Sequence, residues 1–395
     1  MKRPNLYILL LFFLLLLPFG QTTANGNDSI RLSLLTCAPG EEIYSLFGHT
    51  AIRYEDPANG IDAVFNYGLF SFNTPNFIFR FSLGETDYQL GATDYAHFAA
   101  EYAFDGRSVW QQTLNLSKEE KAELIRLLQE NYRPENRVYR YNFFYDNCAT
   151  RPRDKIEESI IGKVIYPSEP QDGSRSFRDI VHQYCKGHPW ARFGIDLCIG
   201  SEADRPITQR QMMFAPFYLM DAFAGAQIAN DSIQRPLVSD KALIVDAVSD
   251  EEEGGWMPTP LQCSLLLFIL TAAATIYSLR KRTGLWGVDL VLFGTAGIVG
   301  CVLAFLALFS EHPAVSSNFL LLVFHPGQFL FLPYIIYCVR KGKKCWYLTL
   351  NLIVLTLFIA FFPLIPQRFD FAVVPLALCL LIRSASNLIV TSKKK

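Results

Sequence analysis

The sequence predicts an α+β domain outside the cytoplasm that is followed by an all-α membrane bundle of five helices. The chain has 395 residues, of which 51% are hydrophobic, and its mean hydropathy is +0.19. This composition is too apolar for a wholly soluble protein and too polar for a chain that lies entirely in a membrane. The apolar residues are also unevenly placed, since one apolar run begins the chain and five more fill its last third. A split architecture follows.

Residues 1–24 have the features of a secretory signal peptide. Lys2 and Arg3 precede an apolar run from Leu6 to Phe19, and small residues ending at Ala24 follow it. A positive start, a short apolar stretch and small residues at the cut are the pattern of such a peptide. We expect cleavage after Ala24, and an uncleaved segment would act as a short anchor. Both alternatives place the next part of the chain outside the cytoplasm.

Residues 25–249 form the predicted domain outside the membrane, because none of their apolar runs is long enough to cross a bilayer. Ser117 and Glu120 form a capping box that begins a helix, and this helix ends near Tyr132. Short runs of branched and aromatic residues predict strands at Ile30–Leu35, Thr50–Tyr54, Ala63–Leu69, Val109–Leu114 and Val138–Phe144. The domain is therefore of the α+β class.

An acidic, glycine-containing linker, residues 250–260, separates this domain from the predicted membrane domain, residues 261–395. Five apolar segments in the second domain have the length of membrane helices: Leu261–Leu279, Gly287–Phe309, Phe319–Val339, Trp346–Ile365 and Phe371–Val390. Basic clusters follow the first, third and fifth segments, and the positive-inside rule places these ends and the C-terminus in the cytoplasm. The formal net charge of −1 leaves no basic surplus for a nucleic-acid partner.

Cys148 is the candidate nucleophile among the nine cysteines. It lies between an aromatic strand and a predicted helix whose first turn suits Pro152. The helix dipole, together with Arg151 and Arg153, favours a thiolate, and the free N–H groups of a helix start are suited to hold an oxyanion. A buried structural cysteine and one half of a disulfide are the alternatives.

His49 is the candidate base for Cys148. It stands at the predicted start of a strand, and Asn66 lies on the next strand along the chain. A side-chain amide such as that of Asn66 accepts a hydrogen bond from one ring nitrogen and thereby fixes the tautomer. Glu55 and Asp56 are alternatives for this orienting role. A lone histidine in a strand is more often structural, so the prediction depends on the combination with Cys148.

Other histidines compete for a functional role. His312 and His325 lie in or beside the first outer loop of the membrane domain, where either substrate contact or ordinary solvation explains a histidine. His182, Cys185 and His188 resemble a metal site, but their spacing fits no common zinc pattern and three ligands are too few for a structural zinc. We therefore expect no metal.

Two further features have open explanations. Cys185 and Cys198 are close enough in sequence to pair as a disulfide in an oxidising compartment, or to remain free. The alternating aromatic residues Phe77, Phe79 and Phe81 are suited to line an acyl groove, but the core of a strand uses the same pattern.

Several segments carry a resemblance to a known family. In order between Leu34 and Phe223 these are FGHTAIRY, VFNYGLF, FSLGETDYQL, YNFFYDNCATRPRD and MMFAPFYLMDAF. They resemble the periplasmic domain of the Lnb-type lipoprotein N-acyltransferases, and the loop SEHPAVSSNFLLLVFHP resembles the membrane part of that family. The resemblance implies a permuted papain-like (NlpC/P60-like) thiol site in which His49 and Asn66 precede Cys148. It also implies a periplasmic domain on the bacterial inner membrane.

The resemblance implies a lipoprotein N-acyltransferase. The expected reaction moves an acyl chain from a phospholipid, through a Cys148 thioester, to the α-amine of diacylglyceryl-cysteine on an apolipoprotein. Phospholipid, the lipoprotein N-terminus and membrane lipids are the expected partners, and Arg151, Arg153, His312 and His325 the expected substrate contacts. No cofactor is expected, because ester, thioester and amide exchange needs no nucleotide. The alternatives are an NlpC/P60-like cell-wall peptidase or amidase and a non-enzymatic membrane scaffold.

Overall fold

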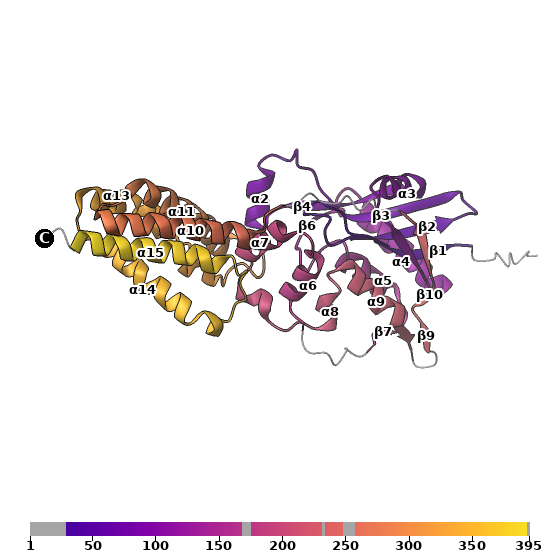
Figure 1. The fold of residues 1–395 in the computed structure, drawn as a ribbon. Coiled ribbons are helices and arrows are strands. Elements are labelled where there is room, and N and C mark those ends of the chain that lie inside the picture. The colour runs from indigo at the N-terminus through magenta and orange to yellow at the C-terminus, as the bar shows by residue number, and fades with distance from the viewer. Residues whose placement is uncertain (1–28, 168–174, 231–233, 248–256, 393–395) are drawn as a thin grey trace, which may run out of the picture.

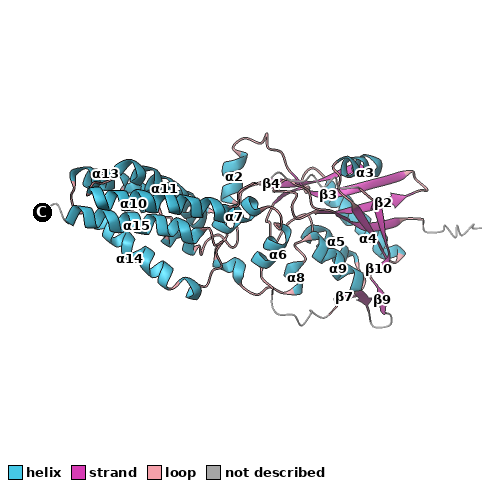
Figure 2. Cartoon of the chain, viewed as in Figure 1, coloured by secondary structure: helices cyan, strands magenta, loops and turns pink. Residues whose placement is uncertain are grey.

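The computed structural model describes residues 29–167, 175–230, 234–247 and 257–392. Figure 1 shows a mixed domain around a large sheet beside an all-helical domain, which carries the C-terminus at its far end. Figure 2 shows that the strands of the described residues all lie in the mixed domain. The predicted α+β domain followed by a helical region is confirmed. The predicted signal peptide and most of the predicted linker lie outside the described residues.

The mixed domain is built on a seven-stranded antiparallel sheet with the order β10-β5-β1-β2-β3-β4-β6. Its strands are β1 (Arg31–Cys37), β2 (His49–Asp56), β3 (Ile61–Leu69), β4 (Asp87–Asp94), β5 (Val109–Leu114), β6 (Val138–Arg140) and β10 (Val238–Val245). Four of the five predicted strands are confirmed within two residues. The fifth ends at Arg140 rather than Phe144, because Asn142 and Asp146 hydrogen-bond to each other across a tight turn.

Helices and a small sheet complete the mixed domain. The helices are α2 (Phe77–Leu83), α3 (Tyr95–Phe104), α4 (Lys118–Tyr132), α5 (Thr150–Ser159), α6 (Phe177–Tyr184), α7 (Pro189–Cys198), η1 (Ser201–Asp204), α8 (Gln209–Met212) and α9 (Pro216–Gly225). The small sheet has the order β7 (Lys163–Ile165), β8 (Gln227–Ala229) and β9 (Gln234–Pro236). The aromatic run at Phe77, Phe79 and Phe81 is therefore helical, and the strand explanation is wrong.

Both faces of the large sheet are buried. Leu32 and Leu34 of β1 pack into a core with residues of α4, α5 and α9, whereas Leu35 and Cys37 pack into a second core with residues of α3. Because successive side chains of a strand point to opposite faces, one strand supplies both cores. Helices on both faces hold the sheet rigidly and fix the ends of its strands.

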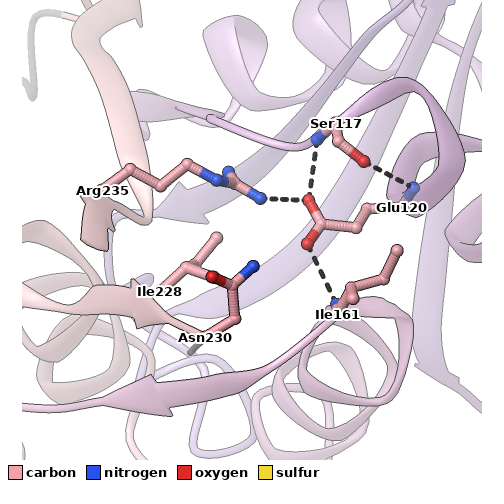
Figure 3. Close-up of a pocket in the computed structure, with 6 residues that line it drawn as sticks. All are labelled: Ser117, Glu120, Ile161, Ile228, Asn230 and Arg235. Carbon is pink, nitrogen blue, oxygen red and sulfur yellow. Dashed lines mark hydrogen bonds and ion pairs between the residues drawn. The ribbon is translucent and has the colours of Figure 1, made fainter. Parts of the chain in front are cut away.

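A buried carboxylate ties the start of α4 to the small sheet. Glu120 is 1% exposed and forms the predicted capping box with Ser117. Figure 3 shows its two oxygens accepting from the backbone N–H groups of Ser117 and Ile161 and from the guanidinium of Arg235. Both oxygens of this carboxylate are hydrogen-bonded to protein groups. The residues around the hollow in Figure 3 therefore have a structural role, which is to join α4 to the small sheet.

The helical domain contains the predicted membrane segments. Its elements are α10 (Pro260–Lys281), α11 (Trp286–Phe309), η2 (Phe319–Leu322), α12 (Pro326–Leu330), α13 (Leu332–Lys341), α14 (Trp346–Ala360), η3 (Phe362–Leu364) and α15 (Val373–Ser392). Within the described residues, α10, α11 and α15 are each long and apolar enough to cross a membrane. The chain is therefore a membrane protein.

The third and fourth predicted spans differ from simple helices. The segment from Phe319 to Lys341 is bent by 72° where α12 meets α13. Pro333 stands in the first turn of α13, where a proline is tolerated, but its ring would clash with the Phe329 carbonyl if α12 and α13 formed one continuous helix. The fourth, α14, has 15 residues and ends before Pro363, so it rises only about 22 Å. The third predicted membrane segment is therefore a bent pair of helices and the fourth is a short apolar helix, while the five-helix membrane bundle stays a prediction.

The charge that interrupts the last span has a partner inside the bundle. Arg383 of α15 and Asp289 of α11 are both fully buried, with 2.7 Å between the guanidinium Nε and a carboxylate oxygen. Asn387 donates a further hydrogen bond to the same carboxylate at 2.9 Å. Opposite charges that face each other inside a helical bundle compensate the cost of leaving water.

A second buried arginine joins the two domains. Arg178 of α6 is 0% exposed and contacts Asp196 at 2.6 Å and Asp204 at 2.9 Å. Asp204 also binds Arg368, from the loop between α14 and α15, at 2.9 Å, and Arg368 reaches Asp179 at 2.6 Å. A chain of alternating charges therefore runs from the mixed domain onto the membrane domain.

Backbone hydrogen bonds reinforce this junction. The N–H groups of Gly200 and Ser201 donate to the carbonyls of Ala314 and Ser317 at 2.6 and 2.9 Å, and the Asn318 side-chain amide donates to the Leu197 carbonyl at 2.7 Å. These bonds join the segment after α7 to the loop that follows α11. The mixed domain is thus fastened to one end of the membrane domain rather than tethered by the linker alone.

Replacing Arg178 is expected to loosen the mixed domain and its junction. Arg178→Leu leaves Asp196 and Asp204 buried without their common counter-charge, which costs about 3–5 kcal/mol. The measurement is thermal unfolding of the full chain in detergent. Arg205→Leu is the matched control, because Arg205 is 73% exposed and its ion pair with Glu202 lies at the surface. Equal melting temperatures for the two variants would contradict the proposed importance of Arg178.

Candidate active site

Cys148 stands directly before α5, as the sequence predicts. The side chain of Asn147, which is 3% exposed, shapes this helix start. Its oxygen accepts from the N–H groups of Ala149 at 2.8 Å and Thr150 at 3.0 Å, while its amide donates to the carbonyls of Phe143 and Phe214. Asn147 therefore locks the loop that carries Cys148 onto the α5 helix.

This capping corrects one expectation about the oxyanion. The first free N–H groups of α5 were expected to hold a developing negative charge, but two of them are already bound to Asn147. The next, from Arg151, donates to the Asn147 carbonyl. An asparagine close before a helix is a common cap, and this preference is the signal by which the sequence identifies the role of Asn147.

His49 and Asn66 are brought together by neighbouring strands. His49 begins β2, and the ring Nε2 lies 3.1 Å from Oδ1 of Asn66 in β3. Since an amide oxygen only accepts, Nε2 carries the proton, and Nδ1 is left free to accept another. Gly48 makes the preceding turn possible, because its φ is +78° and a Cβ there would lie 2.5 Å from the Cys37 carbonyl.

The Cys148 sulfur lies beside the start of β2, at Thr50, the residue that follows His49. The pairing of β2 with β3 ends at Ala51 and Asn66, so the strand ends separate beyond this point. The backbone N–H of Thr50 donates to the Cys148 sulfur there. A Cβ placed on Gly68, at the far end of β3, would lie 3.6 Å from the Cys148 Cβ. The fold thus brings Cys148, from a distant part of the chain, to the strand ends that carry His49 and Asn66.

Both titrating groups are neutral in the resting protein at ordinary pH. Burial raises the pKa of Cys148 to about 11, which outweighs the lowering effect of the N–H groups of Thr50 and Cys148. Burial lowers the pKa of His49 to about 4; the Asn66 hydrogen bond opposes this shift and the charge of Arg107 adds to it. The expectation of a thiolate stabilised by the helix start is corrected, because burial dominates.

Arg151 and Arg153 have partners within the protein. Arg151 binds Asp146 at 2.6 Å and lies over the Tyr139 ring at 3.5 Å. Arg153 is 6% exposed and binds Asp154 and the Arg210 carbonyl. Neither arginine is among the causes of the Cys148 pKa shift. Their predicted contact with substrate stays a prediction.

Tyr139 is a site residue that sequence reasoning missed. It is 7% exposed, and its hydroxyl has no hydrogen-bond partner among the described residues. A Cβ on Gly68 would lie 3.9 Å from this hydroxyl and 3.6 Å from the Cys148 Cβ. Burial, and then the neighbouring Cys148, raise the pKa of Tyr139, so the phenol stays protonated and able to donate. Only the tertiary structure brings this hydroxyl to the thiol.

The two histidines of the outer loop lie in different surroundings. His312 donates from Nε2 to the Phe81 carbonyl of α2 at 2.7 Å. His325 lies inside the helical domain, where its backbone packs against Gly300 of α11 and its ring is 6.1 Å from the Tyr347 ring. These contacts do not bring either histidine to Cys148, and substrate binding by them stays a prediction.

The residues around Cys185 form a structural cluster. His182 binds Asp196 at 2.9 Å, and His188 lies 3.8 Å from Glu41. Within the described ranges, no three His, Cys, Asp or Glu side chains gather in a way that would hold a metal ion. Cys185 is buried and free, so the possible disulfide with Cys198 is absent from this structure.

The sequence matches two family models. Residues 21–172 match the Lnb N-terminal periplasmic domain, and residues 251–395 match the Lnb transmembrane domain. No curated protein and no solved structure matches the chain. The two models cover about three quarters of the sequence and follow each other in the order that the resemblance implies. The chain therefore belongs to the Lnb-type lipoprotein N-acyltransferase family of membrane proteins.

Proposed function

We propose that this protein is a thiol acyltransferase that moves an acyl chain from a phospholipid to the N-terminal amine of a lipoprotein. The proposal is supported by the hydrogen bond from Thr50, the residue after His49, to the Cys148 sulfur, and by the His49–Asn66 hydrogen bond, in a domain fastened to membrane helices. A soluble peptidase has no need of such a junction. We further propose the inner membrane as its location, with the C-terminus in the cytoplasm.

The first half-reaction makes a thioester. Nδ1 of His49 accepts the Cys148 proton as the sulfur attacks the ester carbonyl carbon of the phospholipid. The C–S bond forms, the ester C–O bond breaks, and the lysophospholipid alkoxide leaves with the proton from His49. Because thiol and imidazole start neutral, proton transfer accompanies the attack instead of preceding it. Asn66 holds the ring in the tautomer that leaves Nδ1 free.

The second half-reaction makes an amide. The free α-amine of diacylglyceryl-cysteine attacks the thioester carbonyl, and His49 accepts a proton from the nitrogen. The C–N bond forms, the C–S bond breaks, and Cys148 leaves as a thiol with that proton. The bonds balance without a nucleotide or a metal ion, so the side chains of the site are sufficient for the chemistry.

Two donors near the sulfur are suited to the oxyanion of both steps. The backbone N–H of Cys148 lies beside its own sulfur, and the Tyr139 hydroxyl is buried next to Gly68. A neutral hydroxyl in dry surroundings donates strongly to an oxygen that is becoming negative. Among the described residues, this hydroxyl has no hydrogen-bond partner that it would have to give up when the substrate binds. In the proposed reaction, the substrate oxygen that becomes negative is its acceptor.

Replacing Cys148 is expected to abolish thioester formation. Cys148→Ala should lower transfer by about a thousandfold or more, because no other group supplies the nucleophile. The measurement is mass spectrometry of the Cys148 peptide after reconstitution with phospholipid, where the wild-type protein gains one acyl group. Cys198→Ala is the control, since Cys198 lies at the end of α7 and outside the site. Retained transfer in Cys148→Ala would exclude Cys148 as the nucleophile, and cleavage of cell-wall stem peptides without a thioester would support the peptidase.

Acylation is expected to fall as the pH drops through about 4. His49 accepts a proton only in its neutral form, which predominates above its pKa of about 4. Asn66→Asp places a negative charge beside the ring and should move this acid limb upward by about two units. The measurement is the burst rate of a water-soluble short-chain ester between pH 3.5 and 8. An acid limb near 6.5 in the wild-type protein would contradict the lowered pKa of His49.

Removing the Tyr139 hydroxyl is expected to slow both half-reactions. Tyr139→Phe keeps the ring under Arg151 and deletes only the proposed oxyanion donor, so the chemical rate should fall by about tenfold to a hundredfold. Single-turnover kinetics with a saturating donor separate this loss from weaker binding. The Tyr67 hydroxyl is satisfied by Asn131, which makes Tyr67→Phe the matched control. An unchanged rate in Tyr139→Phe would exclude this donor.

A further inference from the structure

The α2 helix has an unusual surface for a helix in water. It is seven residues long, and none of its residues is buried. Ile78 is 79% exposed, Phe79 57% and Phe81 44%. Burial of apolar side chains drives folding, so a short helix that leaves three of them in water loses much of its driving force to fold. The exposed apolar side chains of α2 are explained if an apolar partner covers them.

The α2 helix lies at the end of a membrane helix. The Glu311 N–H, just past α11, donates to the Leu83 carbonyl at 2.8 Å. A Cβ on Gly84 would lie 3.0 Å from the backbone nitrogen of His312, so the lack of a side chain at Gly84 allows the end of α2 to approach the end of α11 closely. The Phe79 ring is 5.8 Å from the Phe305 ring of α11. Figure 1 shows α2 at the junction of the two domains.

The exposed apolar surface of α11 continues onto α2. Near the end of α11, Leu308 is 75% exposed and Phe309 65%. These residues belong to a helix whose length and hydropathy suit a membrane span. Arg80, on α2, is part exposed and binds Asp87 at 2.9 Å, which gives the helix a polar edge beside its apolar face. Apolar and charged residues arranged in this way are typical of helices that lie in the membrane interface.

Behind α2, aromatic rings lead toward the catalytic thiol. We call this set the aromatic cluster: Tyr44, Phe70, Phe72, Phe77, Phe81, Tyr88 and Tyr141. Phe77 of α2 stacks on Phe70 at 5.5 Å, Phe70 stacks on Tyr88 at 5.0 Å, and Tyr88 stacks on Tyr141 at 4.2 Å. Tyr88 is also the strand partner of Tyr139, and the Tyr139 hydroxyl and the Cys148 Cβ both border Gly68, so the rings lead to the surroundings of the thiol.

The outer part of the cluster is open to solvent. Tyr44 is 59% exposed and Phe72 64%, and their rings are 6.1 Å apart. Tyr44 lies in the turn that precedes His49, so the exposed rings extend from α2 to the strand that carries the base. A saturated hydrocarbon chain packs well on such a surface, because aromatic faces offer large apolar contact areas.

We propose that α2 lies in the outer leaflet of the membrane and that the aromatic cluster receives the acyl chain of a phospholipid on its way to Cys148. The proposal rests on the acyl transfer proposed above and adds the place where the donor leaves the bilayer. The partner is the acyl chain itself, since the surface is apolar and continuous with the lipid-facing side of α11. A protein partner would have to compete with lipid at the same depth.

Photocrosslinking tests the contact without relying on activity. The photoreactive residue p-benzoylphenylalanine replaces Ile78 in the full chain, reconstituted in vesicles of radiolabelled phosphatidylethanolamine. We expect lipid adducts at least about tenfold above those at position 104. Phe104 is the matched control, because it is 92% exposed on α3, which Figure 1 shows far from the membrane domain. Equal labelling at the two positions would overturn the proposal.

Transfer from two donors separates this proposal from the proposed reaction. Ile78→Asp should lower thioester formation from vesicle phospholipid by about fivefold or more, and leave it unchanged with dihexanoylphosphatidylcholine below its micelle concentration. Phe104→Asp should match the wild-type protein with both donors. If Ile78→Asp and the wild-type protein transfer equally well from vesicles, lipid entry at α2 is refuted and the acyltransferase proposal is not. A wild-type protein that forms no thioester with either donor would refute the acyltransferase proposal itself.

Discussion

The geometry of this protein depends on one network of charges at the junction of its domains. Arg178 is wholly buried and binds Asp196 and Asp204, and Asp204 also binds Arg368 from the membrane domain. A carboxylate shared between two guanidinium groups is held from both sides, so neither domain shifts without uncovering a charge. Through this network the sheet that carries the thiol site has a fixed position above the helices.

Within the mixed domain, the site depends on where two strands separate. Pairing of β2 with β3 ends at Ala51 and Asn66, and Cys148 meets the freed N–H of Thr50 beyond that point. The same separation leaves His49 and Asn66 side by side at the end of the sheet. Burial raises the pKa of the thiol and lowers that of the ring, so both groups are neutral before any substrate binds.

Local sequence patterns predicted much of the fold. Branched and aromatic residues predicted strands such as Val109–Leu114, which has the same bounds in the structure, and the pair Ser117 and Glu120 predicted the start of α4. Long apolar runs located α10, α11 and α15. These sequence patterns failed where tertiary packing decides the secondary structure. The alternation at Phe77, Phe79 and Phe81 suits a strand by period, but the segment forms the helix α2 against the end of α11. Neither the bend before α13 nor the early end of α14 follows from hydropathy, which ignores prolines.

The sequence alone determined the class of the protein and the residue types of its candidate chemistry. Composition, topology signals and the settings of Cys148, His49 and Asn66 are local properties of the chain, and the match to the two Lnb domains agrees with them. Only the tertiary structure decided what surrounds that chemistry. It showed that Asn147 occupies the helix N–H groups, that burial dominates the two pKa shifts, and that the Tyr139 hydroxyl and Cys148 border the same glycine, Gly68. Desolvation and hydrogen-bond partnership depend on atoms from distant parts of the chain, and no local pattern records which atoms those are.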